Sequence, residues 1–320
     1  MNKNDPAFKL DAVTFGEAMA MFIATETGDL AAVDNYTRGL AGAETNVAVG
    51  LSRLGLRVGW ISRLGADSFA RFIRATLARE GVDTSHVATD PQYLTGLLFK
   101  TRVDDGSDPK VEYFRRNSAA SHLSLADFDA DYVLSARHLH ASGVAPALSE
   151  TSYAFAEYTM DQMRAAGRTV SFDPNLRPGL WSSQAVMVEK LNRLAARATW
   201  VFPGVKEGAI LTGFDKPADI AAFYLDLGAQ LVAVKLGAEG AYWRTATEHA
   251  IVRGVPVEHV VDTVGAGDGF AAGMISALLE GENISDAVSR GNRVGAFAIQ
   301  VRGDMDGLPT RPQLGLADAA

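Results

Sequence analysis

The chain has 320 residues, of which 48% are hydrophobic and 21% are charged, a composition typical of a globular protein with a large core. It contains no cysteine, which excludes disulfides, thiolate metal sites and cysteine nucleophiles. A net charge of -8 argues against nucleic-acid binding, which requires a basic face. There is no secretory signal and no run of about 18 apolar residues, so we expect a cytoplasmic protein that does not associate with membranes.

Short β-branched or aromatic runs alternate with longer helical patterns along the chain. The runs are predicted strands at 12–15, 58–62, 138–141, 169–172, 200–202 and 231–236. Apolar residues at spacings of three and four predict helices at 45–54, 68–80, 153–166, 184–196 and 220–227. This alternation predicts an α/β fold with parallel strands and right-handed helical crossovers. Ligands should then bind beyond the carboxyl ends of the strands, in the loops after Ala141, Phe172, Leu236 and Val261.

Two stretches, roughly 18–40 and 95–114, interrupt this alternation. In the second, extended segments at 96–102 and 110–114 flank Asp104-Asp105-Gly106-Ser107-Asp108-Pro109, a sequence typical of a turn. Together the two stretches predict a small β-sheet that forms a lid over the core. Because no linker or shift in composition divides the chain, we expect residues 1–320 to form a single domain.

A glycine-rich turn, Asp262-Thr263-Val264-Gly265-Ala266-Gly267-Asp268, lies between an apolar stretch at 257–261 and a helical pattern at 271–279. We interpret these segments as strand, turn and helix. Small residues let backbone N–H groups approach an anion at the helix N-terminus, where the helix dipole favours negative charge. The aspartate can accept the proton of a hydroxyl group that attacks a phosphoryl group held there. From these residues alone, an aspartate that only caps the helix remains the alternative.

The stretch from Asp262 to Phe270 closely resembles the C-terminal signature of ribokinase-like sugar kinases. Residues 41–48, Ala-Gly-Ala-Glu-Thr-Asn-Val-Ala, resemble the family's first signature, Gly-Gly-x-x-x-Asn-x-Ala. The resemblance spans about residues 11–314 and implies a ribokinase-like three-layer α/β/α fold with a central, mostly parallel sheet and a β-sheet lid. It also implies an enzyme that uses ATP and Mg²⁺, with K⁺ as a further cation that the sequence leaves open. The catalytic residues are then Asp268 and the turn residues Gly265, Ala266 and Gly267.

Two arginines, Arg115 and Arg177, follow predicted strands that should face the cleft. A guanidinium holds a carboxylate through paired hydrogen bonds, so these residues suit an acidic sugar. A surface ion pair is the ordinary alternative, and we prefer it for the neighbouring Arg116. The segments at 113–121 and 173–181 resemble those of 2-keto-3-deoxygluconate kinases, most closely the Bacillus type. That resemblance assigns the substrate to Gly42, Asn46, Tyr113, Arg115, Arg177 and Asp304.

The implied reaction is ATP-dependent phosphorylation of 2-keto-3-deoxygluconate to its 6-phosphate. Ala41 replaces the first glycine of the sugar signature, and Leu98 stands where related enzymes place a tyrosine that contacts the substrate. Loss of a hydroxyl donor widens substrate tolerance, so a fructokinase, a ribokinase and a 5-dehydro-2-deoxygluconokinase stay open. An alternative of a different class is a sugar-sensing binding protein without catalysis.

The segment Lys235-Leu236-Gly237-Ala238-Glu239-Gly240 follows a predicted strand and resembles the family's nucleotide loop. Its glycines permit close approach of a flat, polyanionic ligand. We assign the nucleotide to Asn175, Lys235, Gly237, Gly240 and Asn292. Glu207 is retained from an Asn-x-x-Glu motif in which Gly204 replaces the asparagine, and it can position Mg²⁺ through water. A solvated helix position is the alternative for Glu207.

The predicted lid also bears on assembly. An exposed sheet edge is a ready surface for pairing with another strand, and many sugar kinases of this type are dimers. We therefore expect a homodimer or higher homo-oligomer that assembles through the lid.

Overall fold

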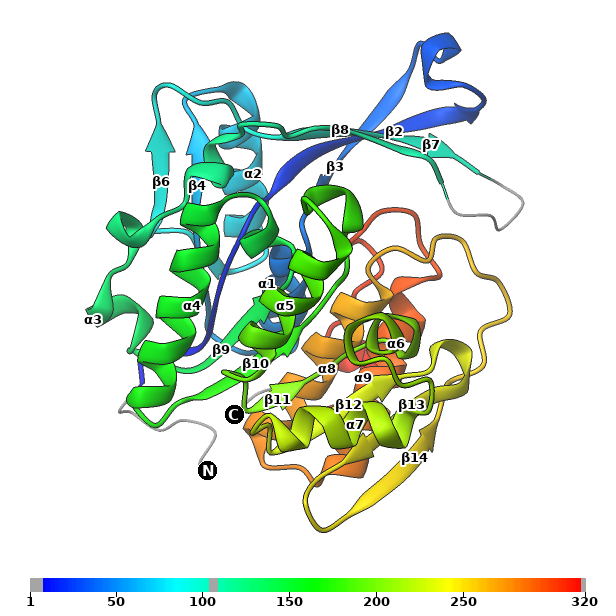
Figure 1. Ribbon diagram of the computed structural model, residues 1–320. Helices are drawn as coiled ribbons and strands as arrows, with labels where there is room; N and C mark the ends of the chain where they lie inside the picture. The colour runs from blue at the N-terminus through cyan, green and yellow to red at the C-terminus, as the bar shows by residue number, and fades with distance from the viewer. Residues whose placement is uncertain (1–7, 104–108, 318–320) are drawn as a thin grey trace.

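A computed structural model describes residues 8–103 and 109–317. The central sheet contains β1 (Leu10–Phe15), β4 (Val58–Gly65), β5 (Val82–Asp83), β6 (Val87–Asp90), β9 (Ala136–Ser142), β10 (Thr169–Asp173), β11 (Trp200–Val201), β12 (Leu231–Lys235), β13 (Gly240–Arg244) and β14 (His249–Arg253). Its order in the described residues is β14-β13-β12-β11-β10-β9-β1-β4-β5, with β6 paired to β4 (Figure 1). The strands from β12 to β5 are parallel, whereas β13 and β14 are antiparallel to their neighbours.

Helices cover both faces of this sheet. One face packs against α1 (Ala43–Arg53), α2 (Ser68–Arg79), α8 (Ala266–Glu280) and α9 (Ile284–Ala298). The other packs against α3 (Ala130–Val133), α4 (Glu150–Ala165), α5 (Gln184–Ala195), α6 (Val205–Thr212) and α7 (Pro217–Asp226). Short 3₁₀ helices lie at Leu30–Ala32, Ala119–His122, Leu125–Asp127, Ala145–Ala147, Pro178–Leu180, Gly237–Glu239 and Pro312–Leu314. Within residues 8–103 and 109–317, no helix has the length and apolar character needed to cross a membrane.

The strand sequences explain why the sheet is covered on both faces. All six residues of β1 are buried. Alternating side chains point to opposite faces, so Val13 and Phe15 pack in the core beneath α4, whereas Ala12 packs beneath α1. A parallel sheet with near-continuous apolar strands requires this double coverage. The predicted three-layer α/β/α architecture is thus confirmed.

A second, four-stranded sheet projects from one end of the central sheet (Figure 1). It has the order β3 (Tyr36–Ala41), β2 (Met19–Thr27), β7 (Leu97–Arg102) and β8 (Val111–Phe114). A small apolar core of Met19, Met21, Ala41 and Leu98 lies on one of its faces. These strands occupy the two stretches in which the sequence predicted a separate sheet. The turn predicted at Asp104–Asp108 and the chain start at residues 1–7 lie outside the described residues.

One predicted strand, at 257–261, is wrong. Strand β14 ends at Arg253, and the chain is irregular from there to the glycine-rich turn. The apolar residues of this stretch are not in the core, since Val260 is 45% exposed. The backbone N–H groups of Val261 and Asp262 donate instead to the carbonyl of Ile299, at 2.8 and 3.3 Å, where α9 ends. The turn is therefore anchored by a helix end and not by a sheet.

Candidate active site

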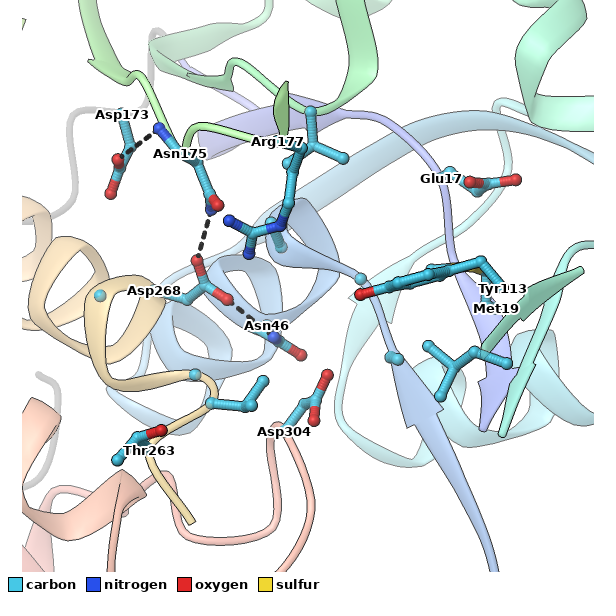
Figure 2. Close-up of a pocket in the computed structure, with 18 of the residues that line it drawn as sticks. Glu17, Met19, Asn46, Tyr113, Asp173, Asn175, Arg177, Thr263, Asp268 and Asp304 are labelled. Atoms are coloured by element: carbon cyan, nitrogen blue, oxygen red, sulfur yellow. Dashed lines mark hydrogen bonds between the residues drawn. The ribbon is translucent and has the colours of Figure 1, made fainter. Parts of the chain in front are cut away.

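A cavity of about 460 Å³ lies where the four-stranded sheet meets the carboxyl ends of the central strands. The small sheet contributes Met19, Ala41, Leu98 and Tyr113 to its wall. The opposite wall comes from the end of β10 and the loop after it, from Lys235 at the end of β12 and from the start of α8, as Figure 2 shows for Asp173 and Asp268. Glu17, in the loop after β1, lies on the same side as Met19 and Tyr113 (Figure 2). The position of the cavity agrees with the general rule for ligands of open α/β sheets.

The glycine-rich turn forms the N-terminus of α8. Gly265 is the N-cap with a φ of 85°, and the first bond of the helical ladder joins Gly269 N to Gly265 O at 2.8 Å. The amides of Ala266 and Gly267 precede that bond, so they are directed out of the helix end. A side chain at Gly265 would collide with the carbonyl of Asp304, and one at Gly267 would lie 3.3 Å from Lys235 Nζ. The turn thus offers free amides beside an ammonium group, which is an environment for an anion.

Asp268 is held by two asparagine side chains. Asn46 Nδ2 donates to one carboxylate oxygen at 2.8 Å and Asn175 Nδ2 donates to the other at 3.3 Å (Figure 2). Burial raises the pKa of Asp268 to about 7, with Asp173 adding to the rise, whereas the Asn46 hydrogen bond and the charges of Lys235 and Arg177 lower it. A carboxylate that is oriented in this way and titrates near neutral pH suits a general base.

Asp173 organises the floor of the cavity. Its Oδ2 lies 2.5 Å from Lys235 Nζ, and its Oδ1 accepts the backbone N–H of Asn175 at 3.1 Å. Asn175 takes a φ of 40°, a left-handed conformation that this hydrogen bond supports. Burial opposes a charge on Lys235, but Asp173 and Glu207 outweigh burial and raise its pKa. Lys235 is therefore a fixed cation next to the turn.

Glu207 lines the cavity but also has a structural task. Its two carboxylate oxygens accept the backbone N–H groups of Leu176 and Gly204, each at 2.8 Å. Through the second contact, Glu207 caps the start of α6 by accepting the backbone N–H of its N-cap residue. Among the described residues, no group of three or more His, Asp or Glu side chains is arranged to hold a metal ion. A role in positioning Mg²⁺ therefore stays a prediction for Glu207.

The two predicted carboxylate-binding arginines differ in their surroundings. Arg115 is paired with Glu17, at 2.5 Å between Nη2 and Oε2, and Glu17 is only 1% exposed. Ser118 donates to the other oxygen of Glu17. Arg177 is exposed and donates to the carbonyl of Leu176, and the described part of the chain provides no ion pair for it. Because the charge of Arg115 is already balanced by Glu17, the guanidinium of Arg177 is the one of the two that is more available to bind a substrate carboxylate.

Gly42, Asn46, Tyr113 and Asp304 also line the cavity. A side chain at Gly42 would meet the carbonyl of Glu17 at 2.5 Å, so only glycine fits at the start of α1. The Oδ1 atom of Asn46 is buried without a partner in the described residues, and it faces the same space as Asp268 and Asp304 (Figure 2). A substrate hydroxyl donating to this oxygen would satisfy it. Exposed Arg116 lies outside this set, as preferred from the sequence.

Four of the assigned residues do not line this cavity: Ala266, Gly237, Gly240 and Asn292. Asn292 Nδ2 donates to the carbonyls of Val252 and Arg253, at 3.2 and 3.1 Å, which ties α9 to β14. Gly240 has a φ of 105° and packs against the Val252 carbonyl. These contacts give Asn292 and Gly240 structural reasons for their identity, and their role at a nucleotide stays a prediction.

Glu17 and Asp173 line the cavity but were not assigned from the sequence. Glu17 follows β1, and Asp173 ends β10. The rule that ligands bind at the carboxyl ends of parallel strands selects both positions, because each is the first acidic residue there. No comparable pattern in the sequence indicates that Glu17 pairs with Arg115.

Comparison with known proteins agrees with this geometry. Residues 9–311 match the model of the pfkB family of carbohydrate kinases. The chain is 54% identical over 307 residues to a 2-dehydro-3-deoxygluconokinase of Bacillus subtilis (strain 168), covering 96% of this chain and 94% of the relative. It is also similar to the solved structure of a PfkB protein from Polaromonas sp. JS666, with 54% identity, a TM-score of 0.90 and coverage of 96% and 100%.

A putative ribokinase II from E. coli, solved in complex with ATP and Mg²⁺, has 27% identity and a TM-score of 0.89, with coverage of 96% of this chain and 98% of that chain. These matches span nearly the whole described chain and agree with the ribokinase-like architecture of the two sheets. The chain belongs to the pfkB family of carbohydrate kinases.

Proposed function

We propose that this protein transfers the terminal phosphoryl group of ATP to the 6-hydroxyl of 2-keto-3-deoxygluconate. The observation that carries the proposal is Asp268, a buried carboxylate oriented by Asn46 and Asn175 beside the free amides of a helix N-terminus. The same compound, as 2-dehydro-3-deoxygluconate, gives its name to the relative from Bacillus subtilis, which is 54% identical.

In the proposed reaction, Asp268 accepts the proton of the substrate's terminal hydroxyl as the oxygen attacks the phosphoryl group. The amides of Gly265, Ala266 and Gly267 and the ammonium of Lys235 stabilise the charge on the group in transfer. Arg177 holds the substrate carboxylate, and Asn46 accepts a hydroxyl. The small sheet lines one side of the cavity, where it restricts the access of water to the bound substrate.

The charges of the cavity support the use of Mg²⁺ with ATP. Among the described residues that line it are the carboxylates Glu17, Asp173, Glu207, Asp268 and Asp304 and the cations Arg115, Arg177 and Lys235. An acidic sugar and a polyphosphate would add further negative charge to this excess of carboxylates. Oxygen ligands such as Glu207 and Asp173 fit Mg²⁺, which when bound supplies positive charge to the phosphates. The E. coli relative was solved with the same pair of ligands.

The test is a panel of substrates whose phosphorylation is measured by a coupled assay for ADP release. The panel compares 2-keto-3-deoxygluconate with 5-dehydro-2-deoxygluconate, fructose and ribose at equal MgATP. We expect the highest kcat/KM for 2-keto-3-deoxygluconate. A higher value for a neutral sugar would overturn the acidic substrate, and sugar binding without ADP release on any member would favour a non-catalytic sensor.

We also propose that two copies pair through the four-stranded sheet. Strand β8 is the last strand of that sheet, and Tyr113 and Phe114 on it are 50% and 59% exposed. An edge strand with exposed aromatic side chains is a surface that pairing with a second copy would cover.

ATP as co-substrate further supports a cytoplasmic location for the reaction.

A further inference from the structure

Lys100 makes an unusual connection between the two sheets. It lies on β7 and is only 3% exposed. Strand alternation places its side chain on the same face as Leu98, which lines the cavity, whereas Phe99 on the opposite face stacks on Phe22. The ammonium leaves the small sheet and ends between two carboxylates of the central unit. Its Nζ lies 2.5 Å from Asp262 Oδ2 and 3.4 Å from Asp304 Oδ1.

Both acids shape the glycine-rich turn. Asp262 Oδ1 accepts the backbone N–H of Val264 at 3.1 Å, which bends the chain into the turn. The backbone of Asp304 packs against Gly265, and its side chain lines the cavity beside Asn46 (Figure 2). The Lys100 ammonium therefore contacts both Asp262, which begins the turn, and Asp304, whose backbone packs against it.

A buried ion pair by itself is weak support for function, because loss of hydration offsets the attraction between the charges. Here, however, the three partners come from separate parts of the chain: Lys100 from the small sheet, Asp262 from the turn and Asp304 from the loop after α9. Two carboxylates this close to each other repel unless a cation lies between them. The position of the small sheet thus decides whether that cation is present.

We propose that Lys100 is a positioning residue: seating of the small sheet places its ammonium between Asp262 and Asp304 and so holds the turn amides and Asp304 in their catalytic arrangement. This inference rests on the proposed function of the turn. It links substrate enclosure to phosphoryl transfer, because the same contact that seats the sheet aligns the amides of residues 265–267.

The test compares Lys100→Met with Lys110→Met, a matched loss of an exposed lysine near the same sheet. Both are assayed with the sugar that the wild-type protein phosphorylates best. We expect kcat to fall roughly 10²-fold for Lys100→Met, the scale reported for misplaced catalytic groups, with KM for ATP and sugar changing far less. The control should keep wild-type values. An unchanged kcat for Lys100→Met would overturn the inference.

A double variant, Lys100→Met with Asp262→Asn, separates positioning from stability. The asparagine keeps the oxygen that accepts Val264 N–H and removes one of the two buried charges. Lys100→Met alone should lower Tm, because it leaves two buried carboxylates without a cation. The double variant should have a Tm closer to the wild-type value, while its kcat stays low. Recovery of kcat together with Tm would show a purely structural ion pair and overturn the inference. If the wild-type protein phosphorylates no sugar, the proposed function itself fails and the inference fails with it.

Discussion

Replacing Asp268 by asparagine tests two consequences of burying a carboxylate in the cavity: its role as a general base and its effect on the stability of the fold. The two side chains have the same shape, and the amide oxygen can still accept the hydrogen bond from Asn46. The variant loses the group that takes the substrate's proton, and loss of a general base lowers turnover by roughly 10²–10⁴. That loss corresponds to about 3–5 kcal/mol in the activation barrier.

The same substitution should stabilise the fold at neutral and alkaline pH. Burial raises the pKa of Asp268 from 3.8 to about 7, so the folded protein binds this proton more tightly than the unfolded chain does. Protonation of Asp268 therefore favours the folded state. This contribution to the free energy of unfolding is fully present below about pH 4 and is lost as pH rises through about 7. Above that pH, the ionised carboxylate lowers the free energy of unfolding by about 4 kcal/mol, a penalty that asparagine removes.

Turnover is measured by coupled ADP release, and Tm by thermal unfolding at about pH 5 and about pH 8, two values on either side of the relevant titration. We expect a variant that is nearly inactive yet has a higher Tm than the wild-type protein at the higher pH, with a smaller gain at the lower pH. The exposed Asp215→Asn serves as a matched control with unchanged turnover and Tm. Near-normal turnover of Asp268→Asn would refute the base role, and a lower Tm at the higher pH would refute the burial argument.

Three further tests concern substrate charge, pH and assembly. Arg177→Ala should raise KM for the acidic sugar roughly tenfold or more and leave KM for fructose nearly unchanged, because the guanidinium holds the carboxylate; equal effects on both sugars would discredit that role. The kcat/KM of the wild-type protein should rise with pH through about 7, since Asp268 must lose its proton to act as a base, and a flat profile in this range would contradict the assignment. Phe114→Glu places a charge on the exposed edge strand, so light scattering should show a shift from dimer to monomer, whereas an unchanged mass would rule out this interface.

Local patterns in the sequence predicted the parts of the fold that depend on local physics. The alternation of short apolar runs with amphipathic segments located the strands and helices because burial repeats with the period of each element. The stretch at 257–261 was misread because apolar side chains alone do not make a strand. Within the described residues, that segment has no neighbouring strand to pair with, and its backbone bonds to the end of α9.

Long-range pairings were beyond the reach of sequence patterns. Arg115 was assigned to the substrate and does line the cavity, but its pairing with Glu17, 98 positions earlier in the chain, was not predicted. Lys100 likewise resembles an ordinary polar residue of an exposed strand until Asp262 and Asp304 are placed beside it. Both contacts depend on how the small sheet is set against the central sheet, which no local pattern describes.

The most direct test of the proposed reaction is the structure of its product. Wild-type protein is incubated with MgATP and 2-keto-3-deoxygluconate, and the product is analysed by mass spectrometry and phosphorus NMR. The geometry around Asp268 predicts a single phosphate on the terminal oxygen of the keto acid, formed together with ADP. Absence of phosphorylated product, or a phosphate on another oxygen, would contradict the assignment of Asp268 as the base for the terminal hydroxyl.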